Sequence, residues 1–137
     1  MISILCVEDE KDVRTLIVEE LEDAGIRTLQ ATNGREGLDM ILKHRPDIVI
    51  SDISMPEMSG TELLAELQIN HPAFSNTPFI FLTALADREM MLEGLRAGAD
   101  NYLTKPIGFD LLLAKLSGLI LRIENRVAAG FARRQSR

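Results

Sequence analysis

The chain has 137 residues, of which 46% are hydrophobic, 26% charged and 4% aromatic, with no tryptophan. This composition excludes a disordered chain, a collagen-like repeat and a disulfide-stabilised scaffold, because a chain this apolar can bury a core. Its one cysteine, Cys6, cannot form an internal disulfide, and neither a secretory signal nor an uninterrupted membrane-spanning stretch is recognisable. We therefore expect a cytoplasmic protein that does not enter a membrane.

The net charge of −6 is unevenly distributed along the chain. Residues 126–137 contain four arginines and no acid, so residues 1–125 carry 11 basic and 21 acidic side chains. An acidic body argues against direct nucleic-acid binding, which requires a basic surface, and it favours a cation as ligand. We expect one domain over residues 1–125 and a basic tail or linker over residues 126–137.

The first half of the chain alternates between strand and helix patterns. A buried strand is expected at residues 3–7, a weaker one at 26–31 and a further buried strand at 48–51. The intervening apolar stripes predict two helices, one ending at Gly25 and one near Pro46. The stripes consist of Val13, Leu16, Ile17 and Leu21, and of Gly37, Leu38, Ile41 and Leu42.

The second half continues the same alternation, with strands expected at residues 79–82 and 101–104. Three further helices are indicated, the second of them between Asp87 and Gly98. Their apolar stripes are Leu63, Leu64 and Leu67; Met91, Leu92 and Leu95; and Phe109, Leu112, Leu113, Leu116, Ile120 and Ile123.

Five strand–helix units in strict alternation predict an α/β fold with an open, doubly wound, five-stranded parallel sheet. They are too few for a closed eight-stranded barrel. In an open sheet of this kind, ligands bind beyond the carboxyl ends of the strands.

Polar side chains follow four of the predicted strands. Glu8 and Asp9 follow the first strand, Asp52 the third, Thr83 the fourth and Lys105 the fifth. If the first and third strands are neighbours, three carboxylates converge and must take up protons or bind a cation.

This set of residues has the chemistry of a phosphoryl-transfer site. Oxygen ligands favour Mg²⁺, the lysine ammonium can pair with a phosphoryl oxygen, and the threonine hydroxyl can donate a hydrogen bond. Taken singly, the acids could be helix-start or turn residues, the threonine a cap and the lysine a surface residue. Their joint placement at four strand ends favours the site.

Four motifs carry a resemblance to a known family: Glu8-Asp9, residues 52–60 (DISMPEMSG), Thr83-Ala84 and residues 98–106 (GADNYLTKP). In this order and spacing, they resemble the receiver (response-regulator) domain of two-component signalling, over about residues 2–124. The resemblance implies a flavodoxin/CheY-like sheet with strand order 2-1-3-4-5.

The resemblance also implies roles for the residues of the site. Asp52 would accept a phosphoryl group from a histidine kinase or phosphotransfer protein. Asp9 and Asp52 would bind Mg²⁺ (or Mn²⁺) with Ser54, through its main-chain carbonyl, and Glu8 would act through a water molecule. Thr83 would hydrogen-bond the phosphoryl group, Lys105 would pair with it, and Pro106 would follow a cis peptide bond.

Switching is implied for Thr83 and Tyr102. In the family, an aromatic side chain at the position of Tyr102 turns inward when the threonine moves toward the phosphoryl group. The output face would then comprise the fourth helix, with Met90 and Met91, the fifth strand and the fifth helix. The alternative is that Tyr102 is an ordinary half-buried strand residue.

The end of the chain leaves several interpretations open. An apolar stripe continues from Phe109 to Val127, which indicates a coiled-coil start, a connection to an effector domain or a homodimer contact, or else a frayed tail. Asn101, Ile107 and Lys115 depart from the pattern of the family's DNA-binding branch, whose symmetric dimer is therefore not implied.

The leading hypothesis is a signalling domain that catalyses its own phosphorylation and dephosphorylation, rather than a turnover enzyme, and acts through protein contacts. The alternative is a Mg²⁺-dependent phosphohydrolase with Asp52 as nucleophile, although Ser54 stands where such enzymes carry a second aspartate. An adaptor with an inactive site is opposed by the complete set of site residues. A nucleotide-binding flavodoxin relative is opposed by the lack of a glycine-rich phosphate loop.

Overall fold

The computed structural model describes residues 2–84, 89, 92, 95, 96, 98, 99 and 101–135. The chain forms two units, Met1–Ile107, which contains the sheet, and Gly108–Arg137, which contains helix α5 (Phe109–Gln135). The predicted fourth helix, with Asp87, Met90 and Met91, lies outside the described residues apart from isolated positions.

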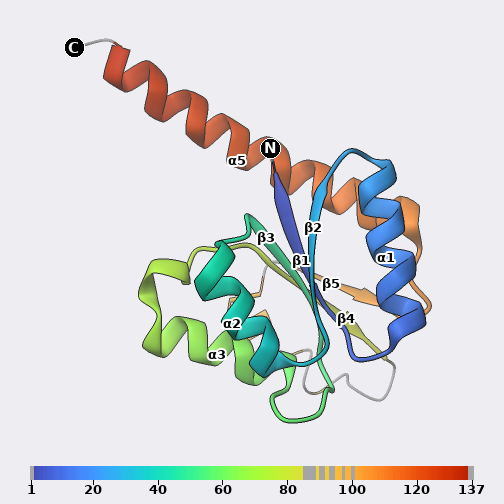
Figure 1. Cartoon of the computed structure of the whole chain (residues 1–137). Helices are drawn as coiled ribbons and strands as arrows, with labels where there is room; N and C mark the ends of the chain where they lie inside the picture. The colour runs from blue at the N-terminus through green and yellow to red at the C-terminus, as the bar shows by residue number, and fades with distance from the viewer. Residues whose placement is uncertain are drawn as a thin grey trace. The chain divides into compact units, whose positions relative to one another are not determined.

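Five parallel strands form one sheet in the order β2-β1-β3-β4-β5, which confirms the predicted fold class (Figure 1). The strands are β1 (Ser3–Val7), β2 (Arg27–Ala31), β3 (Ile48–Asp52), β4 (Phe79–Thr83) and β5 (Asn101–Thr104). Because β1 lies between β2 and β3, the chain changes direction across the sheet after β2, and the carboxyl ends of β1 and β3 are adjacent.

Two strands are one residue longer than the sequence pattern predicts. Asp52 is the last residue of β3 and pairs with Leu82, and Thr83 is the last residue of β4 and pairs with Thr104. Strand pairing therefore continues through both polar residues, because their backbone groups complete the ladder regardless of side chain.

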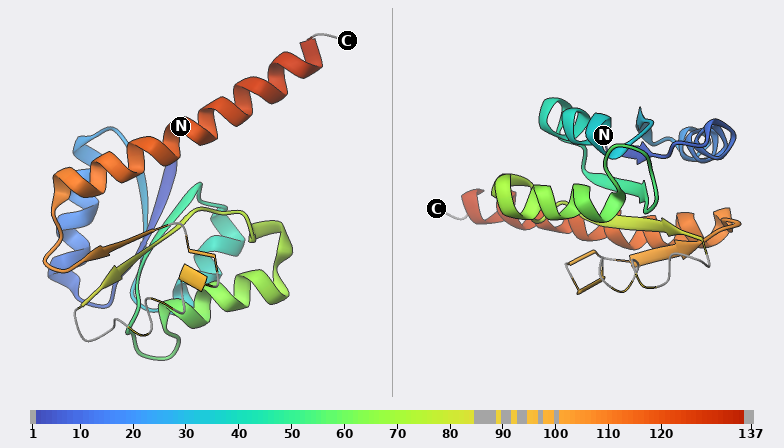
Figure 2. Two further views of the ribbon diagram at one scale, coloured as in Figure 1. Left: turned by 180° about the vertical axis from the view of Figure 1, so that it is seen from behind. Right: turned by 90° about the horizontal axis from the view of Figure 1, so that it is seen from below.

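The helices of the first unit cover both faces of the sheet. Helix α1 (Lys11–Asp23) lies on one side, and α2 (Gly34–His44) and α3 (Gly60–Asn70) lie beside each other on the other side (Figures 1 and 2). A short 3-10 helix, η1 (Pro72–Phe74), follows α3. Leu16 does not belong to the buried stripe as predicted: it is 52% exposed, because α1 buries Ile17, Val18 and Leu21 instead.

Alternate strand residues build the core under α2 and α3. Leu5, Val7, Val49, Phe79 and Phe81 belong to one buried cluster, which also contains the apolar side chains of the two helices. Phe79 and Phe81 meet edge to face with ring centroids 5.1 Å apart, the favoured arrangement of an aromatic pair. Strands β3 and β4 are buried along their whole length, so the core encloses their carboxyl ends.

Helix α3 begins with a capping box immediately after the loop that follows β3. The Ser59 hydroxyl accepts a hydrogen bond from the Glu62 amide, and the Glu62 carboxylate accepts one from the Ser59 amide. Both bonds satisfy amides that the helix itself leaves unpaired. The cap therefore determines where the loop ends and the helix begins.

Replacing Ser59 with alanine is expected to lower the free energy of unfolding by about 1 kcal/mol, because it removes the cap of α3. The measurement is urea denaturation followed by circular dichroism. Ser117→Ala is the matched control, since the Ser117 hydroxyl only bonds the Leu113 carbonyl within α5. Equal unfolding midpoints for Ser59→Ala and the control would contradict the role assigned to the cap.

Helix α5 continues to Gln135, well past the last predicted apolar position of the domain. Segment 126–135 is therefore helical, and Leu121 and Val127 on this helix are 57% and 67% exposed.

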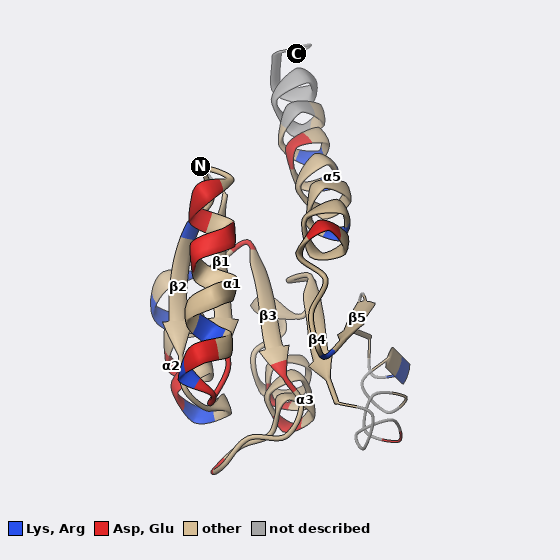
Figure 3. Cartoon of the chain, turned by 90° about the vertical axis from the view of Figure 1, so that its right-hand side faces the viewer, with Lys and Arg blue, Asp and Glu red and all other residues tan. Residues whose placement is uncertain are grey.

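Acidic positions gather along α1 (Figure 3). Among the residues that the structure describes, no helix combines the length and apolar character that a membrane span requires.

Candidate functional site

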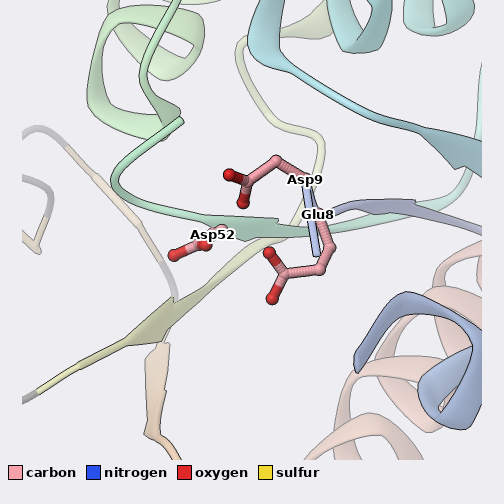
Figure 4. A group of neighbouring side chains, drawn as sticks. All are labelled: Glu8, Asp9 and Asp52. Atoms are coloured by element: carbon pink, nitrogen blue, oxygen red, sulfur yellow. The ribbon is translucent and has the colours of Figure 1, made fainter. Parts of the chain in front are cut away.

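The carboxyl ends of β1 and β3 bring three acids together. Val7 pairs with Ser51, so Glu8, directly after β1, and Asp52, the last residue of β3, lie side by side with Asp9 next to them (Figure 4). One carboxylate oxygen of each acid lies within 4.8 Å of the others. Glu8 and Asp52 are buried, with 0% and 5% of their surface exposed, whereas Asp9 is exposed. The predicted convergence of the three carboxylates is thus present.

Lys105, directly after β5, reaches into this acid cluster. Its Nζ lies 2.7 Å from Glu8 Oε1 and 3.1 Å from Asp52 Oδ2. Its main-chain amide donates to the Thr83 carbonyl at 2.8 Å, and the Lys105–Pro106 peptide bond is cis, as the resemblance predicts. One ammonium group therefore contacts two buried acids at once.

Burial and neighbouring charges together raise the pKa values of both Glu8 and Lys105. Burial, reinforced by the neighbouring Asp52 carboxylate, raises the pKa of Glu8 to about 8, although the Lys105 ammonium opposes the rise. Burial alone would lower the pKa of Lys105, but the contacts with Glu8 and Asp52 outweigh it and raise that pKa. At neutral pH the cluster therefore retains a proton as well as the lysine charge.

Asp52 and Thr83 have internal hydrogen-bond partners in this structure. Asp52 Oδ1 accepts a hydrogen bond from the Ile53 amide at 2.8 Å, which orients the carboxylate. The Thr83 hydroxyl, on the neighbouring strand end, donates to the Ala84 carbonyl at 2.9 Å. It must leave that carbonyl before it can donate to a group on Asp52.

The two remaining predicted site residues lie outside the acid cluster. Ser54 is exposed in the loop after β3, two residues beyond Asp52. Tyr102 lies on β5, pairs with Phe81 and packs partly buried against the core cluster. Tyr102 is thus connected to the site through the β4–β5 pairing.

Two neighbours of the site were not predicted from the sequence. The Arg14 guanidinium donates to the Glu8 carbonyl at 2.7 Å, and Glu10 Oε1 lies 3.7 Å from Lys105 Nζ. A basic residue near the start of a helix, where acids are favoured, is the sequence signal that could have drawn attention to Arg14. Glu10 carries no such signal, because acids are common at this position.

The donor set fits a hard divalent cation. Oxygen atoms on opposite sides of one Mg²⁺ ion lie about 4.2 Å apart, since each bond is about 2.1 Å long. The three carboxylates thus span close to the distance that one ion requires. Oxygen ligands without nitrogen or sulfur favour Mg²⁺ or Mn²⁺ over softer metals.

Comparison with protein families agrees with this fold and site. A family described as the response regulator receiver domain matches residues 4–117. The chain belongs to this family, and it is a receiver domain of two-component signalling.

Curated relatives include two whole regulators. The chain is 36% identical over 129 residues to the response regulator MprA of Mycolicibacterium vanbaalenii, covering 94% of this chain and 54% of MprA. It is 35% identical over 120 residues to the phosphate regulon transcriptional regulatory protein PhoB of Pseudomonas aeruginosa, covering 88% of this chain and 52% of PhoB. The chain thus spans about half the length of these relatives.

Solved structures include isolated domains of similar size. The receiver domain of the Francisella response regulator 1452 superposes with a TM-score of 0.80 at 35% identity, covering 90% of this chain and 99% of that one. The chemotaxis response regulator CheY4 of Vibrio cholerae gives a TM-score of 0.79 at 34% identity, covering 87% and 98%.

Proposed function

We propose that this receiver domain accepts a phosphoryl group from a phosphohistidine onto Asp52, in a reaction that requires Mg²⁺ or Mn²⁺. The observation that carries the proposal is the convergence of Glu8, Asp9 and Asp52, with the Lys105 ammonium in contact with Glu8 and Asp52. Asp9, Asp52 and the Ser54 main-chain carbonyl would bind the cation, and Glu8 would act through a bound water molecule.

The proposed reaction is a nucleophilic substitution at phosphorus. A carboxylate oxygen of Asp52 forms the new O–P bond while the N–P bond of the phosphohistidine breaks, and the imidazole nitrogen keeps the electron pair. The bound cation supplies positive charge that offsets repulsion between the carboxylate and the phosphoryl oxygens. Lys105 supplies a second positive charge within reach of Asp52. Thr83, at the end of the adjacent strand β4, supplies a hydroxyl that would donate a hydrogen bond to the phosphoryl group.

The proposed switch links Thr83 with Tyr102. The Thr83 hydroxyl would exchange the Ala84 carbonyl for a phosphoryl oxygen, and Tyr102, partly buried on the next strand, would change its position in response. A change of side-chain packing on β5 would then alter the surface that an effector recognises.

The proposed partners are a sensor histidine kinase or a histidine phosphotransfer protein, and a downstream effector domain or protein. PhoB of Pseudomonas aeruginosa is a transcriptional regulatory protein, which is consistent with an effector of that kind. We also infer a cytoplasmic location, from the unpaired, buried Cys6.

Residues 126–137 would act as a linker. The exposed Leu121 and Val127 of α5 would allow a homodimer contact through this helix.

The family match gives no support to the alternative of a phosphohydrolase. Such an enzyme would need a general acid near the nucleophile, and the residue two positions after Asp52 is Ser54. We therefore propose a signalling domain with its own phosphorylation and dephosphorylation chemistry.

The proposal is tested by incubating the protein with a small acyl phosphate and measuring the intact mass. We expect one phosphoryl adduct that forms with Mg²⁺ and does not form when the metal is removed by a chelator. An adduct that forms equally well without metal would contradict the metal dependence. Continuous release of phosphate from ordinary monoesters would favour the phosphohydrolase instead.

Mg²⁺ affinity should depend on pH because the cation competes with the proton on Glu8. Since the pKa of Glu8 is raised to about 8, the acid is mostly protonated at pH 7 and mostly ionised at pH 9. Mg²⁺ should bind about tenfold more tightly at pH 9 than at pH 7. Calorimetric titration at both values measures this change, and Glu8→Gln, which cannot ionise, should reduce it. An unchanged pH dependence in Glu8→Gln would assign the proton to another group.

A further inference from the structure

The loop between β3 and α3, residues 53–59, is held by hydrogen bonds at its base. The Gly60 amide donates to the Ile53 carbonyl at 2.7 Å, and a Cβ atom on Gly60 would lie only 2.2 Å from the Asp52 carbonyl oxygen. The loop therefore leaves β3 and returns to it within a short distance of Asp52. Ser54 lies inside this loop, directly beyond its anchored base.

The far side of the loop contains a tight turn. The Met58 amide donates to the Pro56 carbonyl at 2.8 Å, and Glu57 between them has a φ of 67°. A three-residue turn with positive φ at a residue other than glycine is rare and strained. Such a turn persists only where the surrounding structure holds it, so a contact with the rest of the fold is needed.

That contact is made by the first residue of α2, Gly34. The Gly34 amide, which has no partner within its own helix, donates to the Met58 carbonyl at 3.0 Å. A Cβ atom on Gly34 would lie 2.4 Å from the Met58 oxygen and 2.9 Å from the Met58 Cβ. Gly34 is buried, so only a residue without a side chain allows the helix to approach the loop this closely.

We propose that Gly34 is a positioning residue of the cation site: through the Gly34–Met58 contact, α2 holds the loop in the conformation that places the Ser54 carbonyl. The inference rests on the proposed function, since Ser54 is a cation ligand only within it. A side chain at position 34 must move the Met58 carbonyl by about 1 Å to reach an ordinary contact of 3.4 Å. A displacement of that size in a ligand-bearing loop is enough to impair a site.

Hydrogen exchange of the wild-type chain tests this inference with Mg²⁺ as the probe. If opening of the Gly34–Met58 contact destroys the cation site, Mg²⁺ must suppress that opening. The Gly34 amide should then exchange about 100-fold more slowly at a Mg²⁺ concentration 100 times its dissociation constant. The Arg45 amide, which donates to the Ile41 carbonyl at the opposite end of α2, is the internal control and should not change.

Gly34→Ala provides the second test, with Gly118→Ala as its matched control because a Cβ atom there meets nothing within 4 Å. We expect Gly34→Ala to weaken Mg²⁺ binding at least about tenfold in calorimetry, and Gly118→Ala to leave it unchanged. A purely structural role for Gly34 would lower the free energy of unfolding without changing the dissociation constant. If Gly34→Ala does not fold, the exchange experiment on the wild type decides.

Two results would overturn the inference while leaving the proposed function intact. One is wild-type Mg²⁺ binding with no change in Gly34 exchange, or with an equal change at Arg45. The other is a folded Gly34→Ala variant with unchanged Mg²⁺ affinity. Failure of the wild type to bind Mg²⁺ at all would instead overturn the proposed function, and this inference with it.

Discussion

Replacing Asp52 with asparagine is expected to abolish the Mg²⁺-dependent phosphoryl adduct. The amide of asparagine has no anionic oxygen to attack phosphorus, and the substitution also removes one of the two acids closest to the Lys105 ammonium. The side chain keeps its size, so the buried end of β3 stays filled and the fold should be retained. Intact-mass measurement after treatment with an acyl phosphate should show only background phosphorylation.

The control for this experiment is Asp39→Asn, which removes an exposed acid from α2 without touching the acid cluster. It should form the adduct as the wild type does, and circular dichroism should show that both variants are folded. An adduct that persists in Asp52→Asn at the wild-type level would place the acceptor elsewhere.

Lys105→Met is expected to slow phosphoryl uptake by about 10²- to 10³-fold, the usual effect of removing one group that stabilises negative charge in a transition state. Methionine retains most of the apolar stem but loses the charge that lies 3.1 Å from Asp52 Oδ2. Mg²⁺ binding should persist, because Asp9 and Asp52 remain and a neighbouring positive charge is removed. The rate is measured by mass spectrometry at saturating Mg²⁺, and the affinity by calorimetry.

Lys43→Met is the matched control, since Lys43 is exposed in the last turn of α2. Its uptake rate should equal that of the wild type. A Lys105→Met variant that takes up phosphoryl at the wild-type rate would contradict the role of Lys105. Loss of Mg²⁺ binding without any loss of the metal-saturated rate would instead make Lys105 a structural support for the acids.

The alternation of strands and helices could be predicted from the sequence because the buried strands are short and apolar. The predictions for residues 3–7 and 101–104 match β1 and β5, and β3 and β4 extend only one residue further, to Asp52 and Thr83. The strand order could not be predicted from hydrophobic periodicity, which reports burial and not neighbours. It followed from the family resemblance.

The contacts of the site were less predictable than its composition. The convergence of Glu8, Asp9 and Asp52 followed from their places at neighbouring strand ends. The hydrogen bond from Arg14 joins α1 to the Glu8 carbonyl after β1, and the close approach of Gly34 to Met58 joins α2 to the loop before α3. The position of Arg14 near a helix start could have drawn attention to it, but its partner, like the approach of Gly34 to Met58, depends on how the loops pack.

Exposure of single helix residues was also difficult to predict. Leu16 fits an apolar stripe by spacing, yet it is 52% exposed, because α1 is rotated so that Ile17, Val18 and Leu21 are buried. A helical stripe can be wider than the face that is covered, and the sequence does not determine which edge remains exposed.

The central claim is that Asp52 carries the phosphoryl group, and peptide mass mapping of the phosphorylated wild-type protein tests it most directly. The protein is treated with an acyl phosphate and Mg²⁺, digested, and searched for the peptide that gains a phosphoryl group. The proposed function predicts that this peptide contains Asp52 and that it is absent when Mg²⁺ is withheld. A phosphoryl group on a peptide without Asp52, such as one containing His44 or His71, would contradict it.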